Sequence, residues 1–277
     1  MDSTLNLCPE HYNAGQQHAA HFQLGRLVRD TPSKRAPTTL PWLPPSADHT
    51  FTDEIALDIP PAAFDERPYR FFCAHETASK ARAAELVSQR YQWRGYGEEC
   101  GQALLESSQP AQMTFIATQR GQVVGTVSTR LDGGSPLNCD ALYPDITAAK
   151  RAQGHRLAEF GQLAINTTNK PLEAMGPLFH LTVMFAHKKN AATHALIEVN
   201  PRHVAFYRRA FGFTVIGEQR HCLRVDAPAI LMQLDLKIVQ DQITEQGGSR
   251  YGRISVFPYC FSLAESKVIE RTLLRPI

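Results

Sequence analysis

The sequence lacks the long hydrophobic runs that cross membranes. No apolar run approaches the roughly 18 residues that a membrane-spanning helix needs. The first residues, MDSTLNLCPEHYNAG, also lack the basic segment followed by an apolar one that marks a secretory signal. We therefore expect a soluble, cytoplasmic protein without stable insertion into a membrane.

Paired cysteines, clustered metal ligands and an excess of charge are missing as well. None of the six cysteines belongs to a C-x-x-C pair, so we expect free thiols and no metal site. His11, His18 and His21 lie close together, but their segment offers no fixed frame for a metal ion. The chain has 29 lysines and arginines against 27 aspartates and glutamates, which argues against a nucleic-acid partner.

The composition divides the 277 residues into three parts. Residues 1–66 include RDTPSKRAPTTLPWLPPSADHTFTDE, which is rich in proline, serine and threonine and has little periodicity. We expect this amino-terminal extension to be partly disordered, because such a segment buries too little apolar area to offset its ordering entropy. Residues 67–239 are predicted to form the ordered core, and residues 240–277 an extension that packs on it.

The core alternates patterns typical of strands and helices. Its β-rich runs at 112–119 and 122–132 are joined by Arg-Gly, as in an antiparallel hairpin. The apolar segment 171–190 predicts a helix with a break or kink near Gly176 and Pro177. Further strands are expected at 68–76, 156–165, 193–199, 213–219 and 229–236, and further helices at 77–97, 146–154 and 201–211. This order predicts a mixed α/β fold.

The segment IEVNPRHVAFYRRAFGF, residues 197–213, joins a strand to a short helix. Asn200 is suited to cap this helix, Pro201 to its first position and Gly212 to a left-handed residue after its end. Within the helix, His203, Phe206, Tyr207 and Ala210 fall on one face. Such aromatic residues fit a core role as well as a functional one.

This joint and the order of elements resemble the GNAT N-acyltransferase fold, whose late strand-helix unit commonly reads N-x-x-A-x-x-F-Y-x-x-x-G-F. ALYPD, RAQGHRLAEFGQLAI and the apolar helix extend the likeness. Together with SVFPYCFS near the end, they are similar to the N-acyl amino acid synthases of the FeeM type, bacterial relatives of acyl-homoserine-lactone synthases. The resemblance covers residues of about 69 to 236. It implies a central mixed, mostly antiparallel, splayed sheet flanked by helices.

The expected donor follows from a motif that the chain does not contain. Acetyl-CoA enzymes of this fold carry a Q/R-x-x-G-x-G/A turn whose amides hold the pyrophosphate at a helix amino terminus. Here NTTNKPLEAMGP has one glycine and an interposed proline. We therefore expect no bound cofactor, an acyl-phosphopantetheine donor on an acyl carrier protein in preference to acyl-CoA, and an amino acid acceptor.

Two residues are candidates for catalysis. By strand alternation Glu159 shares a face with Leu157, Gly161 and Leu163, where burial would raise its pKa and suit it to act as a general base. The alternative places Glu159 in solvent or in an ion pair with Arg156 or Arg130. The resembling families carry a glutamate at this position, which favours the base.

The resemblance also gives Tyr207 the role of protonating the leaving sulfur. Amides between Gly161 and Ala164 are then expected to hold the oxyanion, since a splayed strand leaves N–H groups unpaired. The predicted substrate-binding residues thus include Gln162, Leu163 and Ala164 on the strand, with His203 and Phe206 on the helix face.

Binding of the acceptor carboxylate is predicted less directly. The lactone-forming relatives place an arginine three residues after the glutamate, where this chain has Gln162. Arg90, Arg94 and Arg130 are the alternative cations, although each fits a surface charge equally well.

Two other functions stay open at the level of sequence. One is a small-molecule acetyltransferase that uses acetyl-CoA, and the other is a non-catalytic module that binds acyl groups. The main reading also predicts a basic docking surface for the acidic carrier protein, and peripheral membrane contact through a lipid product. The docking candidates are Lys188, Lys189, Arg202, Arg208 and Arg209.

Overall fold

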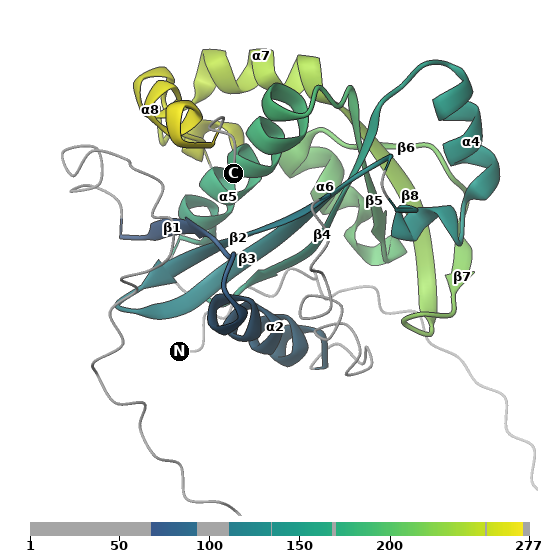
Figure 1. The fold of residues 1–277 in the computed structure, drawn as a ribbon, viewed down its shortest axis with the longest axis horizontal. Coiled ribbons are helices and arrows are strands. Elements are labelled where there is room, and N and C mark those ends of the chain that lie inside the picture. Colours follow the sequence, from purple (N-terminus) through teal and green to yellow (C-terminus); the bar gives the residue numbers. More distant parts are fainter. Residues whose placement is uncertain (1–67, 93–110, 134, 168–169, 253, 274–277) are drawn as a thin grey trace, which may run out of the picture. The chain divides into compact units, whose positions relative to one another are not determined.

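The protein has a mixed α/β fold (Figure 1), which the computed structural model describes over residues 68–92, 111–133, 135–167, 170–252 and 254–273. The strands are β1 (Arg70–Cys73), β2 (Gln112–Gln119), β3 (Gln122–Leu131), β4 (Leu157–Ile165), β5 (His194–Val199), β6 (Thr214–Val215), β7 (Arg220–Cys222) and β8 (Ala227–Asp235). The α-helices are α2 (Thr77–Gln92), α4 (Pro144–Ala152), α5 (Pro171–Val183), α6 (Val204–Phe211), α7 (Leu236–Gln246) and α8 (Leu263–Leu273). Shorter helical segments are η1 (Asn138–Asp140), η2 (Met184–Lys189), η3 (Pro201–His203) and η4 (Phe257–Tyr259). The predicted extension over residues 1–66 lies outside the described residues.

One open sheet organises these elements. The strand order is β1-β2-β3-β4-β5-β8-β6, and β7 pairs with β8. Neighbouring strands are antiparallel except for β4 and β5, which are parallel. The predicted mixed, mostly antiparallel sheet is confirmed.

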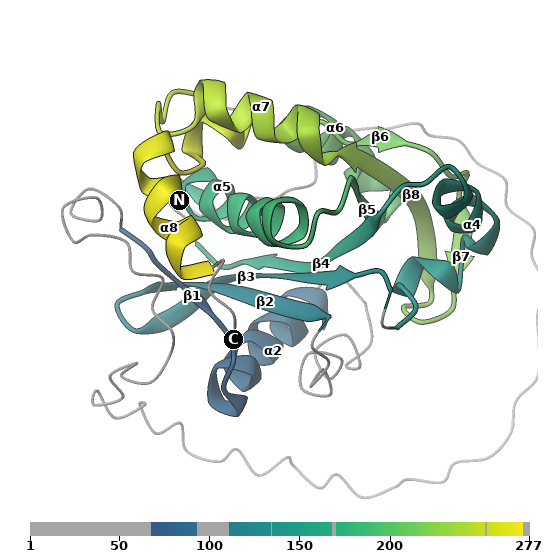
Figure 2. The ribbon, with the colours of Figure 1, turned by 45° about the horizontal axis from the view of Figure 1, so that its top comes forward.

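Helices cover both faces of the sheet (Figure 2). On one face Ile116 packs with Val87 of α2, and on the other Phe115 packs with Leu178 of α5. Because successive side chains of a strand point to opposite faces, the apolar run of β2 supplies both layers at once. The sheet is therefore buried on two sides at its centre.

Local sequence signals set the predicted hairpin and the strand-helix joint. Arg120 and Gly121 have φ of 51° and 75°, the two left-handed residues that a tight type I′ hairpin turn requires. At the joint, the side chain of Asn200 accepts a hydrogen bond from the backbone N–H of Arg202 at 3.3 Å. Gly212 follows α6 with φ of 84°. Both predictions are confirmed.

The helix is not broken near Gly176 and Pro177, because α5 runs through both residues. Pro177 lies inside α5 and has no N–H to donate to the carbonyl of Glu173, four residues earlier. Gly176 is required by packing instead, since the segment that carries Tyr259 crosses the helix there. The thiol of Cys260 donates to the carbonyl of Gly176 at 3.4 Å.

The end of the chain differs from the sequence prediction in its elements. The run at 213–219 forms only the two-residue β6, and β7 follows it unpredicted. The border drawn between residues 239 and 240 falls inside α7. Val239 and Ile243 of α7 lie in the same hydrophobic cluster as Val183 of α5, so this helix belongs to the core.

We expect Gly176→Ala to lower the free energy of unfolding by roughly 1–3 kcal/mol, because overpacking outweighs the gain in helix propensity. A methyl group at this position would lie 2.7 Å from Cβ of Tyr259 and 2.8 Å from its carbonyl carbon. Urea unfolding measures the loss. Gly161→Ala is the control, since its added methyl meets nothing within 4 Å. Equal unfolding free energies for the two variants would contradict this packing.

Candidate functional site

The site lies where β4 and β5 stop pairing. These parallel strands are bonded only where Leu157–Glu159 face His194–Leu196. Beyond that point a cavity of about 240 Å³ lies between them. Residues of β3, β4, β5, α6 and the β7–β8 hairpin line it. Unpaired backbone and side chains from distant parts of the chain therefore meet in one place.

A β-bulge in β4 shapes the wall of this cavity. Between the pairs Thr126–Ala164 and Ser128–Gly161, β4 contains one more residue than β3. Gln162 has φ of 53° at this point. The bulge reverses the alternation, so that Leu163 packs in the same cluster as Phe160. The predicted sharing of one face by Leu163 and Glu159 is therefore wrong.

Glu159 is buried at the last position where β4 pairs with β5. Its side chain lines the cavity, and Oε2 accepts a hydrogen bond from the backbone N–H of Asn138 at 2.6 Å. Burial is the main cause that raises the pKa of this carboxyl from 4.5 to about 7. The nearby charge of Glu198 acts in the same direction, and the Asn138 hydrogen bond acts against it. The described residues form no ion pair between Glu159 and Arg156 or Arg130, so the buried position is the one observed.

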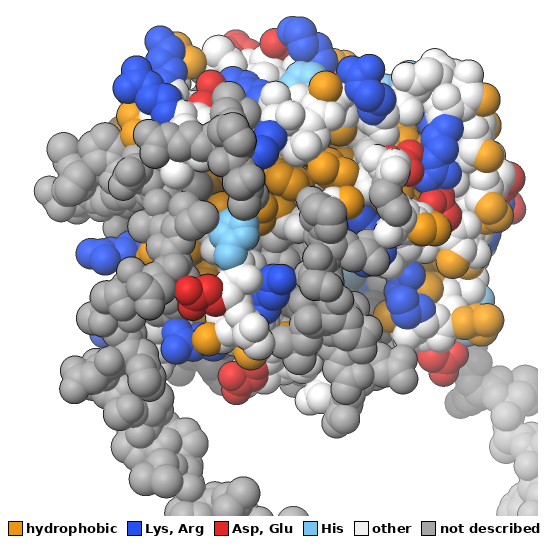
Figure 3. Space-filling model, viewed as in Figure 1, with side chains coloured by type: hydrophobic (Ala, Val, Ile, Leu, Met, Phe, Trp, Pro, Cys, Tyr) orange, Lys and Arg blue, Asp and Glu red, His pale blue; other side chains and the backbone are white. Residues whose placement is uncertain are grey.

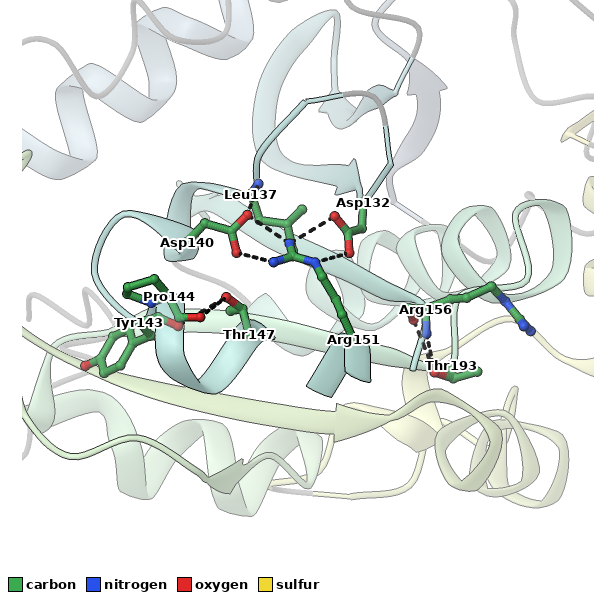
Figure 4. A network of polar contacts seen from close by, with 9 residues as sticks. All are labelled: Asp132, Leu137, Asp140, Tyr143, Pro144, Thr147, Arg151, Arg156 and Thr193. Atoms are coloured by element: carbon green, nitrogen blue, oxygen red, sulfur yellow. Dashed lines mark hydrogen bonds and ion pairs between the residues drawn. The ribbon is translucent and has the colours of Figure 1, made fainter. Parts of the chain in front are cut away.

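An ion-pair network holds the loop that reaches Glu159 (Figure 4). Arg151 of α4 donates to both carboxylate oxygens of Asp132, at 2.7 and 2.9 Å, and to both of Asp140, at 2.9 and 2.8 Å. Asp140 also accepts the N–H of Leu137 at 2.9 Å. These bidentate contacts hold together the loop between β3 and α4 and so position the N–H of Asn138, next to Leu137. Nothing in the linear sequence indicated that role.

A second carboxylate, Glu198 of β5, lines the same cavity. Its side chain is 7% exposed and pairs with Arg224 at 2.5 Å. Arg224 lies in the turn between β7 and β8, and its Nη1 donates to the carbonyl of Asn138 at 3.5 Å. Nothing in the sequence pattern singled out Arg224. Alternation along β5 places Glu198 on the same face as Glu159, but only once the register of β4 and β5 is known.

Tyr207 reaches the cavity from the opposite face of the sheet. It belongs to α6, stacks on Phe211 with ring centroids 5.5 Å apart, and lines the main cavity. It also lines two smaller cavities of about 80 and 40 Å³. Glu159 and Tyr207 are thus brought to one space by different elements.

The described predicted residues gather around these cavities. The main cavity is lined by Glu159, Tyr207, Arg130, Gln162, Leu163 and His203. The adjoining cavity of about 40 Å³ is lined by Arg90, Ala164 and Phe206 together with Leu163, His203 and Tyr207. Arg94 lies outside the described residues. Within the described ranges, no cluster of three or more potential ligands could hold a metal ion, and no helix is long and apolar enough to cross a membrane.

The family of the chain follows from a comparison with known proteins. The family model described as N-acyl amino acid synthase FeeM matches residues 82–235, more than half of the 277 residues. The chain belongs to this family.

The chain is also similar to several solved structures. That of FeeM, an N-acyl amino acid synthase from uncultured soil microbes, is 30% identical, with a TM-score of 0.56 over 62% of this chain and 93% of that one. An aminoglycoside N(6′)acetyltransferase from Legionella pneumophila is 15% identical, with a TM-score of 0.43 over 65% and 99% of the two chains. The AHL synthase LasI is also 15% identical, with a TM-score of 0.40 over 61% and 89%. No match was found among curated proteins.

Membership of the FeeM family makes the protein an N-acyltransferase with the GNAT fold. Such a reaction needs a group that removes a proton from an ammonium, donors for an oxyanion and an acid for the leaving sulfur. A carboxyl with a pKa of about 7, the bulged strand and a phenol occupy one cavity in this FeeM-family protein. The cavity therefore brings a carboxyl, the edge of a strand that no longer pairs with β5 and a phenol together.

The raised pKa of Glu159 predicts a pH-dependent cost in stability. The folded state favours the protonated carboxyl, so stability falls as pH rises from 4.5 to about 7. We expect Glu159→Gln to unfold like the wild type at pH 4.5 and to be more stable at pH 8, by up to about 3 kcal/mol. Urea titrations at the two pH values measure this difference.

Glu218→Gln is the control for this measurement, because the Glu218 side chain is 82% exposed. It should change stability little at either pH. The same stability difference between Glu159→Gln and the wild type at both pH values would contradict a raised pKa.

Proposed function

We propose that this protein is a cytoplasmic enzyme that joins an acyl group, carried as a thioester on an acyl carrier protein, to the amino group of an amino acid. The observation that carries this proposal is the meeting of Glu159 and Tyr207 in one cavity at the break between β4 and β5. Family membership supports acyl transfer to nitrogen, and the site supports the mechanism below.

Glu159 acts as the general base. Its carboxylate takes one proton from the acceptor ammonium, and the neutral amine then attacks the thioester carbon. A group with a pKa of about 7 is well matched to this task, because at neutral pH a large share is ionised and still basic enough to hold the proton. The backbone N–H of Asn138 donates to Oε2 of Glu159 at 2.6 Å and so holds the carboxylate in place.

The bulge of β4 stabilises the charge that develops on the carbonyl oxygen. Past Glu159, β4 has no pairing with β5, so N–H groups of this stretch that point toward β5 face the cavity. Gly161 leaves open space beside the backbone, since a methyl group there would meet nothing within 4 Å. The oxyanion can thus approach the chain closely.

Tyr207 completes the reaction. When the carbon–nitrogen bond has formed, the carbon–sulfur bond breaks and the phenol gives its proton to the leaving thiolate. The new amide nitrogen loses its extra proton, which restores the phenol. A neutral phenol beside a forming thiolate is a suitable acid at neutral pH. The rings of Phe206 and Phe211, 5.4 and 5.5 Å from that of Tyr207, fix its orientation.

The start of α5 favours a carrier protein over CoA as the donor. Pro171 at the first helical position has no N–H, and the N–H of Glu173 is already bonded to the carbonyl of Lys170 at 3.0 Å. Glu173 adds a negative charge to this first turn. A pyrophosphate would find few free amides and a carboxylate there.

An apolar branch of the cavity is suited to the acyl chain. The space of about 80 Å³ next to Tyr207 is lined by aromatic side chains of β4, α5 and α6. They include Phe160, Phe179 and Phe211. We propose that the carbons next to the thioester lie there, and that Phe179 acts as a lining residue as well as a core residue.

The carrier protein would dock near α6. Lys188 is paired with Glu270, and Lys189 donates to the carbonyl of Leu273, so these two predicted docking residues are already engaged by α8. Arg208 and Arg209 are exposed on α6, the helix that carries Tyr207. Figure 3 shows hydrophobic side chains gathered near α5 and α6 with lysine and arginine side chains around them. This arrangement fits an acidic partner that delivers an apolar chain.

Expression of the full chain in a bacterial host tests the function, because the host supplies carrier proteins and amino acids. We expect mass spectrometry of lipid extracts to find new masses equal to a fatty acyl group plus an amino acid. Extracts that contain no such compound would contradict the proposal. In vitro, acyl carrier protein thioesters should be used at least tenfold more efficiently than the same acyl group on CoA, and the reverse preference would exclude the carrier donor.

Glu159→Gln and Tyr207→Phe should each lower kcat by roughly 10²-fold or more, since each removes a proton-transfer group. Initial rates with purified acyl carrier protein thioester measure the loss. Tyr251→Phe is the matched control, because Tyr251 is 88% exposed. A kcat within twofold of the wild type in Glu159→Gln would remove that residue from the mechanism.

A further inference from the structure

Glu198 has one carboxylate oxygen in use and one without a partner. Oε2 accepts the hydrogen bond from Nη2 of Arg224 at 2.5 Å. Oε1 is buried and has no hydrogen-bond partner among the described residues. A buried acceptor without a donor costs free energy, so an empty position of this kind next to a cavity points to a ligand that donates.

Strand register brings this oxygen to the reacting centre. Glu159 pairs with Leu196 across the parallel strands, and Glu198 is two residues further along β5. Residues two apart on a strand point to the same face, so both carboxylates lie on one side of the sheet. Both line the cavity of about 240 Å³. An ammonium group in that space can contact both.

Arg224 supplies the opposite charge beside Glu198. Its Nη1 donates to the carbonyl of Asn138 and its Nη2 to Glu198, whereas a guanidinium has five N–H donors. The side chain is 46% exposed and lines the cavity from the β7–β8 turn. Donors therefore remain for an anion that enters the cavity.

We propose that the Glu198–Arg224 pair binds the zwitterionic head of the acceptor, with Oε1 of Glu198 holding the ammonium and Arg224 the carboxylate. The proposal rests on the proposed function, and it makes the acceptor class α-amino acids rather than simple amines. Glu198 orients the ammonium while Glu159 takes the proton from it. One carboxylate, Glu198, thus positions the ammonium, and the other, Glu159, accepts its proton.

Arg130 is the main alternative for the acceptor carboxylate. It also lines the cavity, but its Nη2 donates to Oε1 of Gln112 at 3.1 Å and its Nη1 to the carbonyl of Pro136 at 3.3 Å. It stands on β3, whereas Arg224 directly contacts Glu198. An amino acid carries its two charges on one carbon, so adjoining partner groups fit it better.

Steady-state kinetics of Glu198→Gln tests the ammonium contact. We expect KM for the acceptor amino acid to rise roughly 10- to 100-fold, the range for loss of a charged hydrogen bond, with KM for the acyl donor unchanged. Glu218→Gln is the control of the same chemistry on an exposed side chain. An unchanged acceptor KM would overturn the proposal while leaving the proposed function in place.

Arg224→Gln tests the carboxylate contact. Wild-type enzyme should prefer an amino acid to its carboxamide by at least tenfold in kcat/KM, and the variant should lose this preference. If Arg130→Gln loses it instead, the head binds to the alternative arginine and the proposal is wrong. Thermal unfolding of each variant shows that it is folded, and Glu198→Asp, which retains the charge, replaces Glu198→Gln if the latter does not fold.

A binding measurement separates this proposal from the proposed function. Each of the twenty standard amino acids is titrated into the full chain by calorimetry without any acyl donor. Binding to the wild type and to Glu218→Gln, but not to Glu198→Gln, supports the proposal even if no acyl product is ever found. Absence of binding to the wild type in a chain that forms no product, or equal binding by Glu198→Gln, overturns it.

Discussion

The loss of pairing between β4 and β5 is the constraint on which the site depends. Two parallel strands hold together for three residues each and then leave a cavity in the middle of a continuous sheet. The pairing of β4 with β3 and of β5 with β8 continues on either side, so the opening is held by a rigid frame. Backbone donors and carboxylates of the strands and the phenol of α6 therefore line one cavity, and regular elements position them.

The opening also explains the electrostatics. Glu159 is the last β4 residue that pairs with β5, and Glu198 lies two residues beyond its partner Leu196 on the same face. The side chains of both carboxylates are buried. The protein offsets this with positive and dipolar groups from outside the sheet, namely Arg224 and the N–H of Asn138. Arg151 acts at one remove, because it ties down the loop that carries Asn138. The two buried carboxylates thus lower the stability of the fold, and the contacts of Arg224, Asn138 and Arg151 offset part of that loss, as is common at functional sites.

Local signals and the family resemblance predicted much of the fold and the site residues on β4 and α6, but not Arg224. Neighbouring residues in the sequence determine the Arg-Gly hairpin, the Asn200 cap and the place of Glu159 on its strand. The sequence pattern therefore predicts all three. The bulge at Gln162 reversed the face of Leu163, which alternation cannot foresee. Arg224 comes from a turn about 65 positions after Glu159 in the chain, and its relation to the site exists only in the folded sheet. Pro177 does not break α5, and the crossing of the segment that carries Tyr259 explains the glycine beside it.

The ionisation of Glu159 is the most direct test of this account, since the mechanism requires a buried carboxyl that titrates near neutrality. Protein labelled with ¹³C at the glutamate carboxyl carbons can be followed by NMR across pH 3 to about 9. The account predicts one glutamate resonance with a midpoint near 7 that is absent from Glu159→Gln. If every glutamate in the wild type titrates below about 5, the usual range for exposed carboxyls, Glu159 is not the base that the structure implies.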